Sequence, residues 1–243
     1  MPGVSDVNFM KIINELLKII YPSVCLFCEA ISDEPVCSKC VGKISYISEP
    51  RCKKCGKPVR SVQQEYCRDC REVEKVFECG RNLWLYRGGV SDSLYRFKYH
   101  NRRINRIFYA EELKKYYGDL IQQWQIEQII PIPLHWRRKM QRGYNQAELI
   151  AKELGKVTGI PVNIRSLIRS KSTVRQKVLS VRERKNNLKG AFQSVHSEDL
   201  CGRVLLIDDI YTTGSTLNEA AKCLKNAGVR KVYFLTISIG QGI

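Results

Sequence analysis

Residues 204–216 read VLLIDDIYTTGST, and this stretch decides the fold prediction. It opens with an apolar run that predicts a strand buried on both faces of a parallel sheet. Asp208 and Asp209 follow where that strand would emerge at its C-terminal edge, and small residues then lead into a helical pattern. Backbone N–H groups of such a turn can surround an oxyanion, and the helix N-terminus favours negative charge. The stretch therefore predicts a phosphate site with two acids beside it.

The acids and hydroxyls of this stretch together indicate a phosphorylated sugar. Two carboxylates would repel a phosphate unless they faced sugar hydroxyls or a bound Mg²⁺. The alternative is a strand ending in two solvated acids before a capped helix, but such a turn needs neither the second acid nor clustered hydroxyls. The residues expected to surround the phosphate are Thr212, Thr213, Gly214, Ser215 and Thr216.

Composition limits the class of protein. A chain of 243 residues can form one domain of ordinary size and a smaller one. Its formal net charge of +17 predicts attraction to nucleic acid, a polyphosphorylated ligand or an anionic membrane surface, without choosing among them. No signal-peptide pattern or membrane-spanning apolar run is evident, so we expect a cytoplasmic protein without membrane insertion.

Eight of the eleven cysteines form four Cys-x-x-Cys pairs. A reducing compartment argues against disulfides, and the spacing suits two structural Cys₄ zinc sites paired in sequential order. A cross-brace pairing, first with third and second with fourth, has the same spacings and stays open, as does redox use of the pairs. The expected ligands are Cys25, Cys28, Cys37 and Cys40 for one site, and Cys52, Cys55, Cys67 and Cys70 for the other.

Two further segments outside the expected sheet carry function-related patterns. Residues 7–20 predict an amphipathic helix, which we expect to pack on the next domain; binding at a membrane surface is the alternative. Residues 96–106 interleave cations with Phe97 and Tyr99, a composition that holds single-stranded nucleic acid. A helix with aromatics inward and cations outward explains the run equally well. The candidate nucleic-acid contacts are Arg96, Lys98, Arg102, Arg103 and Arg106.

The remaining pattern predicts an α/β domain. The pattern first predicts a strand over 82–87. Two helices follow, one over 94–99 with Ser91 as its cap and one over 104–124. From Gln128 onward strands and helices alternate, which indicates a parallel sheet with helices on both faces. Its further strands are expected over 128–133, 162–168 and 231–237, and Asn145 with Glu148 predicts a capping box for the helix between the first two.

Two basic segments lie at the expected carboxyl edge of this sheet. The loop after the strand 128–133 holds Arg137, Arg138 and Arg142, an arrangement expected for binding a diphosphate. Residues 169–189 are long, polar and basic, which is more often a functional lid than a linker. Gln176 and Arg184 of this segment are candidate ligand contacts.

The stretch 204–216 resembles the phosphoribosyl-diphosphate (PRPP) motif of type I phosphoribosyltransferases, and the chain as a whole resembles the ComF family. The resemblance rests on these motifs and covers almost the whole chain: Pro131–His135, Arg142–Gln146, Gln176 with Glu183-Arg184 and Asn187, Gly190–Phe192, Asp208–Thr216, Lys98-Tyr99 and the cysteine pairs. Tyr144 stands where phenylalanine is common in the family.

The resemblance implies an N-terminal helix with a double zinc-ribbon domain over 1–76 and a type I phosphoribosyltransferase-like α/β domain over 77–243. It implies that Asp208 and Asp209 meet the ribose hydroxyls of PRPP bound with Mg²⁺. It also implies cytoplasmic handling of single-stranded DNA during DNA uptake, with the uptake channel and its helicase-like ATPase as partners. A metabolic phosphoribosyltransferase with structural zinc ribbons, and a PRPP-sensing nucleic-acid-binding regulator, are the alternatives. Whether the chain is an enzyme, and for which acceptor, stays open.

Overall fold

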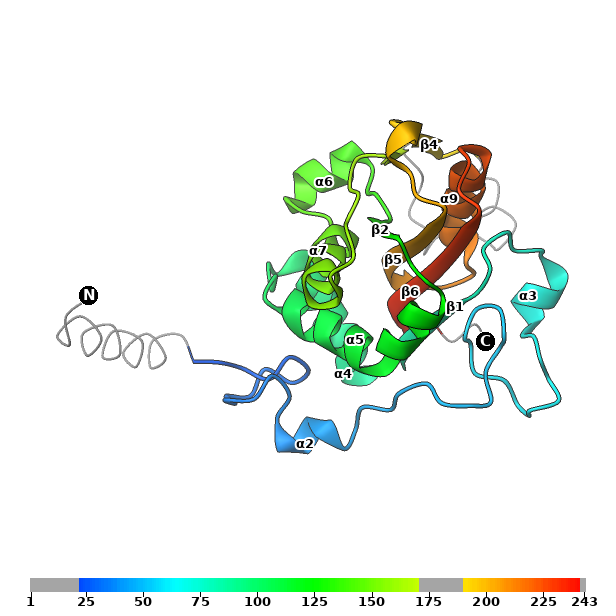
Figure 1. Ribbon diagram of the computed structural model, residues 1–243. Helices are drawn as coiled ribbons and strands as arrows, with labels where there is room; N and C mark the ends of the chain where they lie inside the picture. Colours follow the sequence, from blue (N-terminus) through cyan, green and yellow to red (C-terminus); the bar gives the residue numbers. More distant parts are fainter. Residues whose placement is uncertain (1–21, 171–189, 241–243) are drawn as a thin grey trace, which may run out of the picture.

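The computed structural model describes residues 22–170 and 190–240 (Figure 1). The expected helix over 7–20, and the candidate contacts Gln176 and Arg184, lie outside the described residues. Within them, no helix has the length and apolar character needed to cross a membrane.

A four-stranded parallel sheet in the order β1-β6-β5-β2 forms the centre of the molecule. The alternation of strands and helices predicted a parallel sheet, and this prediction is confirmed. The strands are β1 (Gly80–Leu85), β2 (Gln128–Pro131), β5 (Arg203–Tyr211) and β6 (Lys231–Ile239).

Alternate side chains of the central strands enter two separate cores. In β5, Leu205 and Ile207 belong to the core shared with α5 and α7, whereas Val204 and Leu206 belong to the core shared with α9. Both sets are fully buried, as expected for a strand covered on both faces. The helices on the first face are α4 (Gly88–Tyr99), α5 (Asn105–Gln123) and α7 (Gln146–Thr158), and the helix on the second is α9 (Ser215–Asn226).

The helix starts differ in part from the predicted caps. Asn145 caps α7 by accepting from the backbone N–H of Ala147 at 3.2 Å, but Glu148 does not complete a capping box. It pairs with Lys139 and Lys152 instead. The predicted Ser91 cap is wrong, because α4 begins at Gly88 and the Ser91 hydroxyl donates to the Gly88 carbonyl at 2.7 Å.

The strand predicted over 162–168 is also wrong. Only Val162 makes a parallel bridge, to Ile129, and the chain then turns because the Asn163 side chain accepts from two following backbone N–H groups. The segment ends in an antiparallel pair outside the main sheet. This pair consists of β3 (Leu167–Arg169) and β4 (Phe192–Ser194), and η2 (Ser197–Asp199) follows it.

The two cysteine-rich segments contain little regular structure. Each has one short helix, α2 (Ser38–Val41) or α3 (Arg68–Glu72), that begins directly after a cysteine. Figure 1 places α2 below α4 and α3 beyond β1, at separate sides of the sheet domain. The predicted loop of cations likewise contains a short helix, α6 (Trp136–Arg142).

Candidate functional site

The two acids lie inside β5 rather than beyond its end. The strand continues to Tyr211 because β6 runs beside it, pairing Asp208 with Thr236 and Tyr211 with Ile239. The Asp208 carboxylate accepts from the backbone N–H of Asp209 at 2.9 Å. The strand predicted to end at Ile207 is therefore longer than expected. Because the two acids lie within it, their backbone is held by the sheet.

Lys98 lies next to this acid pair. Its ammonium nitrogen is 2.6 Å from a carboxylate oxygen of Asp209, and the two side chains are 18% and 14% exposed. The sequence interpretation assigned Lys98 to nucleic-acid binding. In the structure it is the cation that neutralises Asp209, at the C-terminal end of α4.

Asp208 has a different environment. Burial, followed by the charge of Asp209, raises the pKa of Asp208 to about 7, although Lys98 and Arg169 oppose the shift. Arg169, on β3, is close enough for its charge to interact with Asp208. Burial and the charge of Arg138 lower the pKa of Arg169 to about 10. The edge of the sheet thus holds two acids among three cations.

The raised pKa of Asp208 predicts a pH dependence of stability. Between about pH 4 and pH 7 the folded protein holds a proton that the unfolded chain releases, so this group stabilises the fold less as pH rises. Asp208→Asn should therefore raise the free energy of unfolding at about pH 8, by an amount on the order of 2–4 kcal/mol. The gain should be smaller at about pH 5. Urea denaturation at both pH values measures it, and an equal gain at both would contradict the raised pKa.

The loop after β5 has the conformation of an anion-binding turn. Gly214 has φ of +73°, and a Cβ there would lie 2.3 Å from the Tyr211 hydroxyl, so only glycine fits. The Thr213 and Ser215 hydroxyls are 2.9 Å apart, at the start of α9. Gly214, the residue before α9, has no side chain with which to cap the helix, and the Ser215 N–H donates to the Thr213 hydroxyl at 3.5 Å. The turn is suited to a phosphate.

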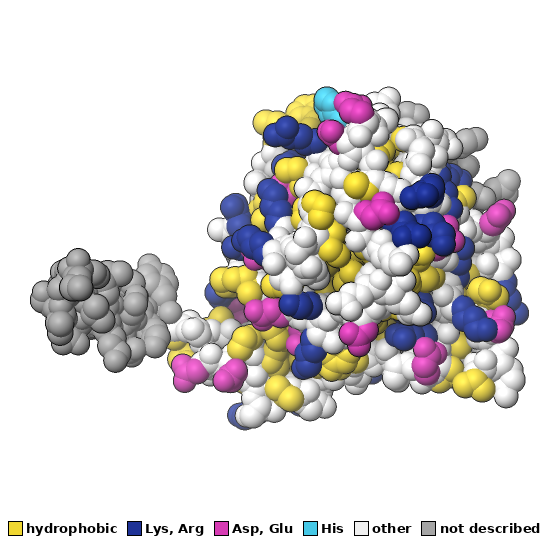
Figure 2. Space-filling view, in the orientation of Figure 1, with side chains coloured by type: hydrophobic (Ala, Val, Ile, Leu, Met, Phe, Trp, Pro, Cys, Tyr) yellow, Lys and Arg dark blue, Asp and Glu magenta, His cyan; other side chains and the backbone are white. Residues whose placement is uncertain are grey.

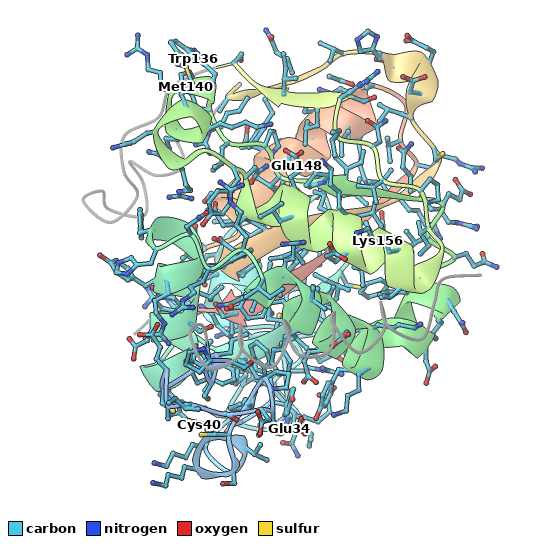
Figure 3. The ribbon with its side chains drawn as sticks, turned by 90° about the vertical axis from the view of Figure 1, so that its left-hand side faces the viewer. Glu34, Cys40, Trp136, Met140, Glu148 and Lys156 are labelled. Atoms are coloured by element: carbon cyan, nitrogen blue, oxygen red, sulfur yellow. The ribbon has the colours of Figure 1, made fainter. Side chains whose placement is uncertain are left out.

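The arginines of α6 divide into two groups. Arg142 lies over the Tyr99 ring at 4.9 Å and donates to Gln146 at 2.5 Å, while Arg137 lies over Trp136 at 5.3 Å. Arg138 interacts electrostatically with Arg169, the arginine whose charge also acts on Asp208. Figure 3 shows Trp136 and Met140 of α6 at the opposite end of the molecule from Cys40 and Glu34, which lie in the first cysteine-rich segment.

The other candidate nucleic-acid contacts have partners within the protein. Arg96 donates to the carbonyls of Leu26 and Phe27, both at 3.0 Å, and Arg102 pairs with Glu29 at 3.2 Å. Arg106 pairs with Glu153 at 2.9 Å, and Arg103 lies 4.5 Å over the Tyr144 ring. Figure 2 shows Lys and Arg side chains spread over the viewed face with acidic and hydrophobic ones between them.

The sequence interpretation missed two residues of this region. Arg169 was assigned only to the start of the basic lid segment, and its place beside Asp208 depends on the antiparallel pairing of β3. Lys75, which follows the last paired cysteine by five positions, donates to the Thr213 carbonyl at 3.0 Å although 138 positions separate the two residues. A local sequence pattern carries no signal for such a contact.

The eight paired cysteines form two separate clusters. The sulfur atoms of Cys25, Cys28, Cys37 and Cys40 all lie within 4.8 Å of one another, as do those of Cys52, Cys55, Cys67 and Cys70. Sulfur–sulfur distances of 3.6 Å occur in both clusters, close to the roughly 3.8 Å edge of a tetrahedral ZnS₄ centre with 2.3 Å bonds. The residues fit zinc, in the sequential arrangement rather than the cross-brace.

Two family models match the chain. The Double zinc ribbon domain model matches residues 16–71, and the Phosphoribosyl transferase domain model matches residues 140–238. The sheet, the cysteine clusters and these matches together define a phosphoribosyltransferase-like α/β fold with an N-terminal double zinc ribbon.

The chain is homologous to competence proteins of the ComF type, as the resemblance predicted. It is 44% identical to Competence protein F of Haemophilus influenzae over 109 residues, which cover 44% of this chain and 47% of that relative. It is 31% identical to Competence protein ComFC of Bacillus subtilis over 155 residues, covering 61% and 58%. DNA utilization protein YhgH of Escherichia coli K12 is 36% identical over 107 residues, covering 44% and 46%. The chain spans about half the length of the curated relatives it matches.

Solved structures of a purine and an adenine phosphoribosyltransferase also align with the chain. A purine phosphoribosyltransferase from Pyrococcus horikoshii covers 56% of this chain and 73% of its own, with 17% identity and a TM-score of 0.32. An adenine phosphoribosyltransferase covers 60% and 75%, with 12% identity and a TM-score of 0.36. The assignment of the fold rests on the sheet and the family models.

Proposed function

We propose that the chain binds PRPP with Mg²⁺ at the carboxyl edge of β5. The observation that carries the proposal is the pair Asp208 and Asp209, held in a strand directly before the glycine turn at the N-terminus of α9. In this proposal the acids meet the ribose hydroxyls, and the loop from Thr212 to Thr216 holds the 5-phosphate. In this arrangement the carboxylates accept hydrogen bonds from the sugar hydroxyls and do not face the phosphate, which reduces the repulsion between them and the phosphate.

The cations around the acids suit the diphosphate of PRPP. Burial, followed by the charge of Arg138, lowers the pKa of Arg169, and both effects would be offset by an anion bound beside these two arginines. Mg²⁺ bound with PRPP would neutralise further charge on the diphosphate. If a transfer reaction occurs, these cations stabilise the charge that develops on the leaving diphosphate.

The test of PRPP binding is thermal melting of the full chain with PRPP and Mg²⁺. We expect PRPP to raise the melting temperature of the wild type and to leave that of Asp208→Asn/Asp209→Asn unchanged. The substitution removes both carboxylates and keeps the size of the side chains, so a lost response reports the site itself.

We further propose that the protein acts as ComF-type proteins do in competence, by handling single-stranded DNA in the cytoplasm during uptake. The names of its relatives, Competence protein F and DNA utilization protein YhgH, support this role. Contacts with the uptake channel and its helicase-like ATPase belong to the same proposal. The metabolic phosphoribosyltransferase is the alternative if DNA does not bind.

Exposed aromatic rings beside arginines favour a DNA-binding surface on α4 and α6. Tyr95 and Tyr99 are 52% and 57% exposed, and Trp136 is 57% exposed. Arg142 already lies over Tyr99, and Arg137 over Trp136. Bases can stack on such rings while arginines contact the phosphates, without reading the sequence.

Single-stranded DNA binding should therefore weaken steeply with salt. The logarithm of the affinity should fall with a slope of about 0.7 per phosphate contact against log salt concentration. Arg102, Arg103 and Arg106 follow α4 directly in the chain, and the ion pairs of Arg102 and Arg106 leave their side chains 45% and 29% exposed. Replacing the three arginines by alanine should therefore flatten the slope and leave the PRPP response intact. Fluorescence anisotropy with a labelled oligonucleotide at several salt concentrations measures this slope.

The control is Lys114→Ala/Lys115→Ala, which removes exposed cations from the middle of α5. This variant should keep the wild-type slope. Flattening in proportion to the number of cations removed, three against two, would mean that only the net charge matters. Binding no better than to a neutral polymer at low salt would contradict the DNA role.

A further inference from the structure

The second cysteine cluster lies against the strand and helix that hold the phosphate turn. Cys52, Cys55 and Cys67 are at most 4% exposed and share one core with Tyr211 of β5 and Leu217 of α9. The first cluster belongs to the other core, with Trp84 of β1 and the helices α4 and α5. The two ribbons therefore pack on opposite faces of the sheet, and the second is on the face of α9.

The connector after the second cluster bonds directly to the turn. Lys75 is 7% exposed as a residue, and its ammonium donates to the carbonyl of Thr213 at 3.0 Å. The backbone N–H of Val76 donates to the side-chain oxygen of Asn218 in the first turn of α9 at 2.8 Å. Asn218 in turn donates its own N–H to the Gly214 carbonyl at 2.8 Å. These bonds fix one side of the turn whose other side would face the phosphate.

Tyr211 forms a second connection between the cluster and the turn. Its ring lies where a Cβ on Gly214 would be, so it sets the path of the backbone there. Its buried hydroxyl finds no nitrogen or oxygen partner among residues 22–170 and 190–240. The Tyr211 ring is itself buried in the core that contains Cys52, Cys55 and Cys67.

The second ribbon is itself fixed to the sheet. The Asn82 amide of β1 donates to the Cys55 carbonyl at 2.7 Å, and the Gly80 N–H donates to the Lys54 carbonyl at 2.9 Å. Gly56 has φ of +73° and fits so closely that a Cβ would lie 3.0 Å from Asn82. A zinc ion holding the four thiolates would therefore fix Cys70 and, five positions later, Lys75 relative to the turn.

We propose that the second ribbon is part of the phosphoribosyl site, with Lys75 as a positioning residue that holds the phosphate turn through the Thr213 carbonyl. The first ribbon has no such role. This inference rests on the proposed PRPP binding for its ligand, but the coupling between ribbon and turn exists without ligand. Losing the second zinc should then loosen residues 212–218 even in the apo protein.

The experiment compares Lys75→Met with the wild-type full chain by PRPP–Mg²⁺ titration calorimetry and by amide hydrogen exchange. A charge-assisted hydrogen bond is lost, so we expect about tenfold weaker PRPP binding and faster exchange across 212–218, with the zinc content unchanged. Asn218→Ala, which removes the other bond, should also speed exchange there. The matched control is Lys54→Met, since Lys54 lies over the Phe77 ring at 5.7 Å in the same ribbon.

The outcomes separate this inference from the proposed function. Wild-type PRPP affinity and wild-type exchange across 212–218 in Lys75→Met would overturn the positioning role. A wild type that binds no PRPP would contradict the proposed function, and the exchange data would still decide the coupling. Cys67→Ser should speed exchange across 212–218 and Cys25→Ser should not; equal effects would also overturn the inference.

Discussion

PRPP with Mg²⁺ is expected to raise the melting temperature of the protein by about 5–10 °C at a concentration near one hundred times its dissociation constant. A ligand that binds only the folded state stabilises it by mass action, here by about 2.7 kcal/mol, and each kcal/mol moves the melting temperature of a chain of this size by about 2–4 °C. Asp208→Asn/Asp209→Asn should lose the whole shift, because both ribose-facing carboxylates are gone.

The apo stability of this double variant is a second readout. Replacing Asp208, whose pKa is raised, by a neutral residue should stabilise the folded protein. Replacing Asp209 removes its ion pair with Lys98 and should destabilise it. The two effects oppose each other, so the variant should melt close to the wild type without ligand. Glu198→Gln/Asp199→Asn makes the same charge change at exposed positions and should keep the PRPP shift. A full shift in the Asp208/Asp209 variant would place the ligand elsewhere.

The freshly purified, reduced protein is expected to contain two zinc ions, and single cysteine variants one. Zinc binding supplies on the order of 10 kcal/mol or more to the folding of small Cys₄ modules, so a broken centre should unfold its ribbon. In Cys25→Ser the structure also predicts a loss of packing beyond the ribbon, because Phe27 contacts the Trp84 ring at 5.8 Å and Phe108 at 6.3 Å. Metal analysis measures the zinc content, and tryptophan fluorescence measures the change in packing around Trp84.

Double variants distinguish the two zinc pairings. In the sequential arrangement, Cys25→Ser/Cys37→Ser damages one centre and leaves one zinc, while Cys25→Ser/Cys52→Ser leaves none. The cross-brace reverses these two results. Protein without zinc before any substitution would contradict the metal assignment itself.

The sequence determined what depends on neighbours along the chain. The apolar run Val204–Ile207 specified a buried strand, and glycine in the turn specified a left-handed backbone, because both signals are local. The cysteine spacing specified two Cys₄ sets for the same reason. It left the pairing open, since sequential and cross-brace arrangements use the same intervals. The strand length at Asp208 was underestimated because it depends on β6, which follows later in the chain.

Only the tertiary structure decided which distant groups meet at the candidate site. Lys98 pairs with Asp209, Arg169 lies beside Asp208, and Lys75 bonds to Thr213. Each residue looked like one more cation in a basic chain, because charge is read from the sequence but its partner is not. The partners follow from the strand order β1-β6-β5-β2 and from the packing of the second ribbon on the face of α9. The strand order and the position of the second ribbon both depend on packing between distant parts of the chain, which no local sequence pattern encodes.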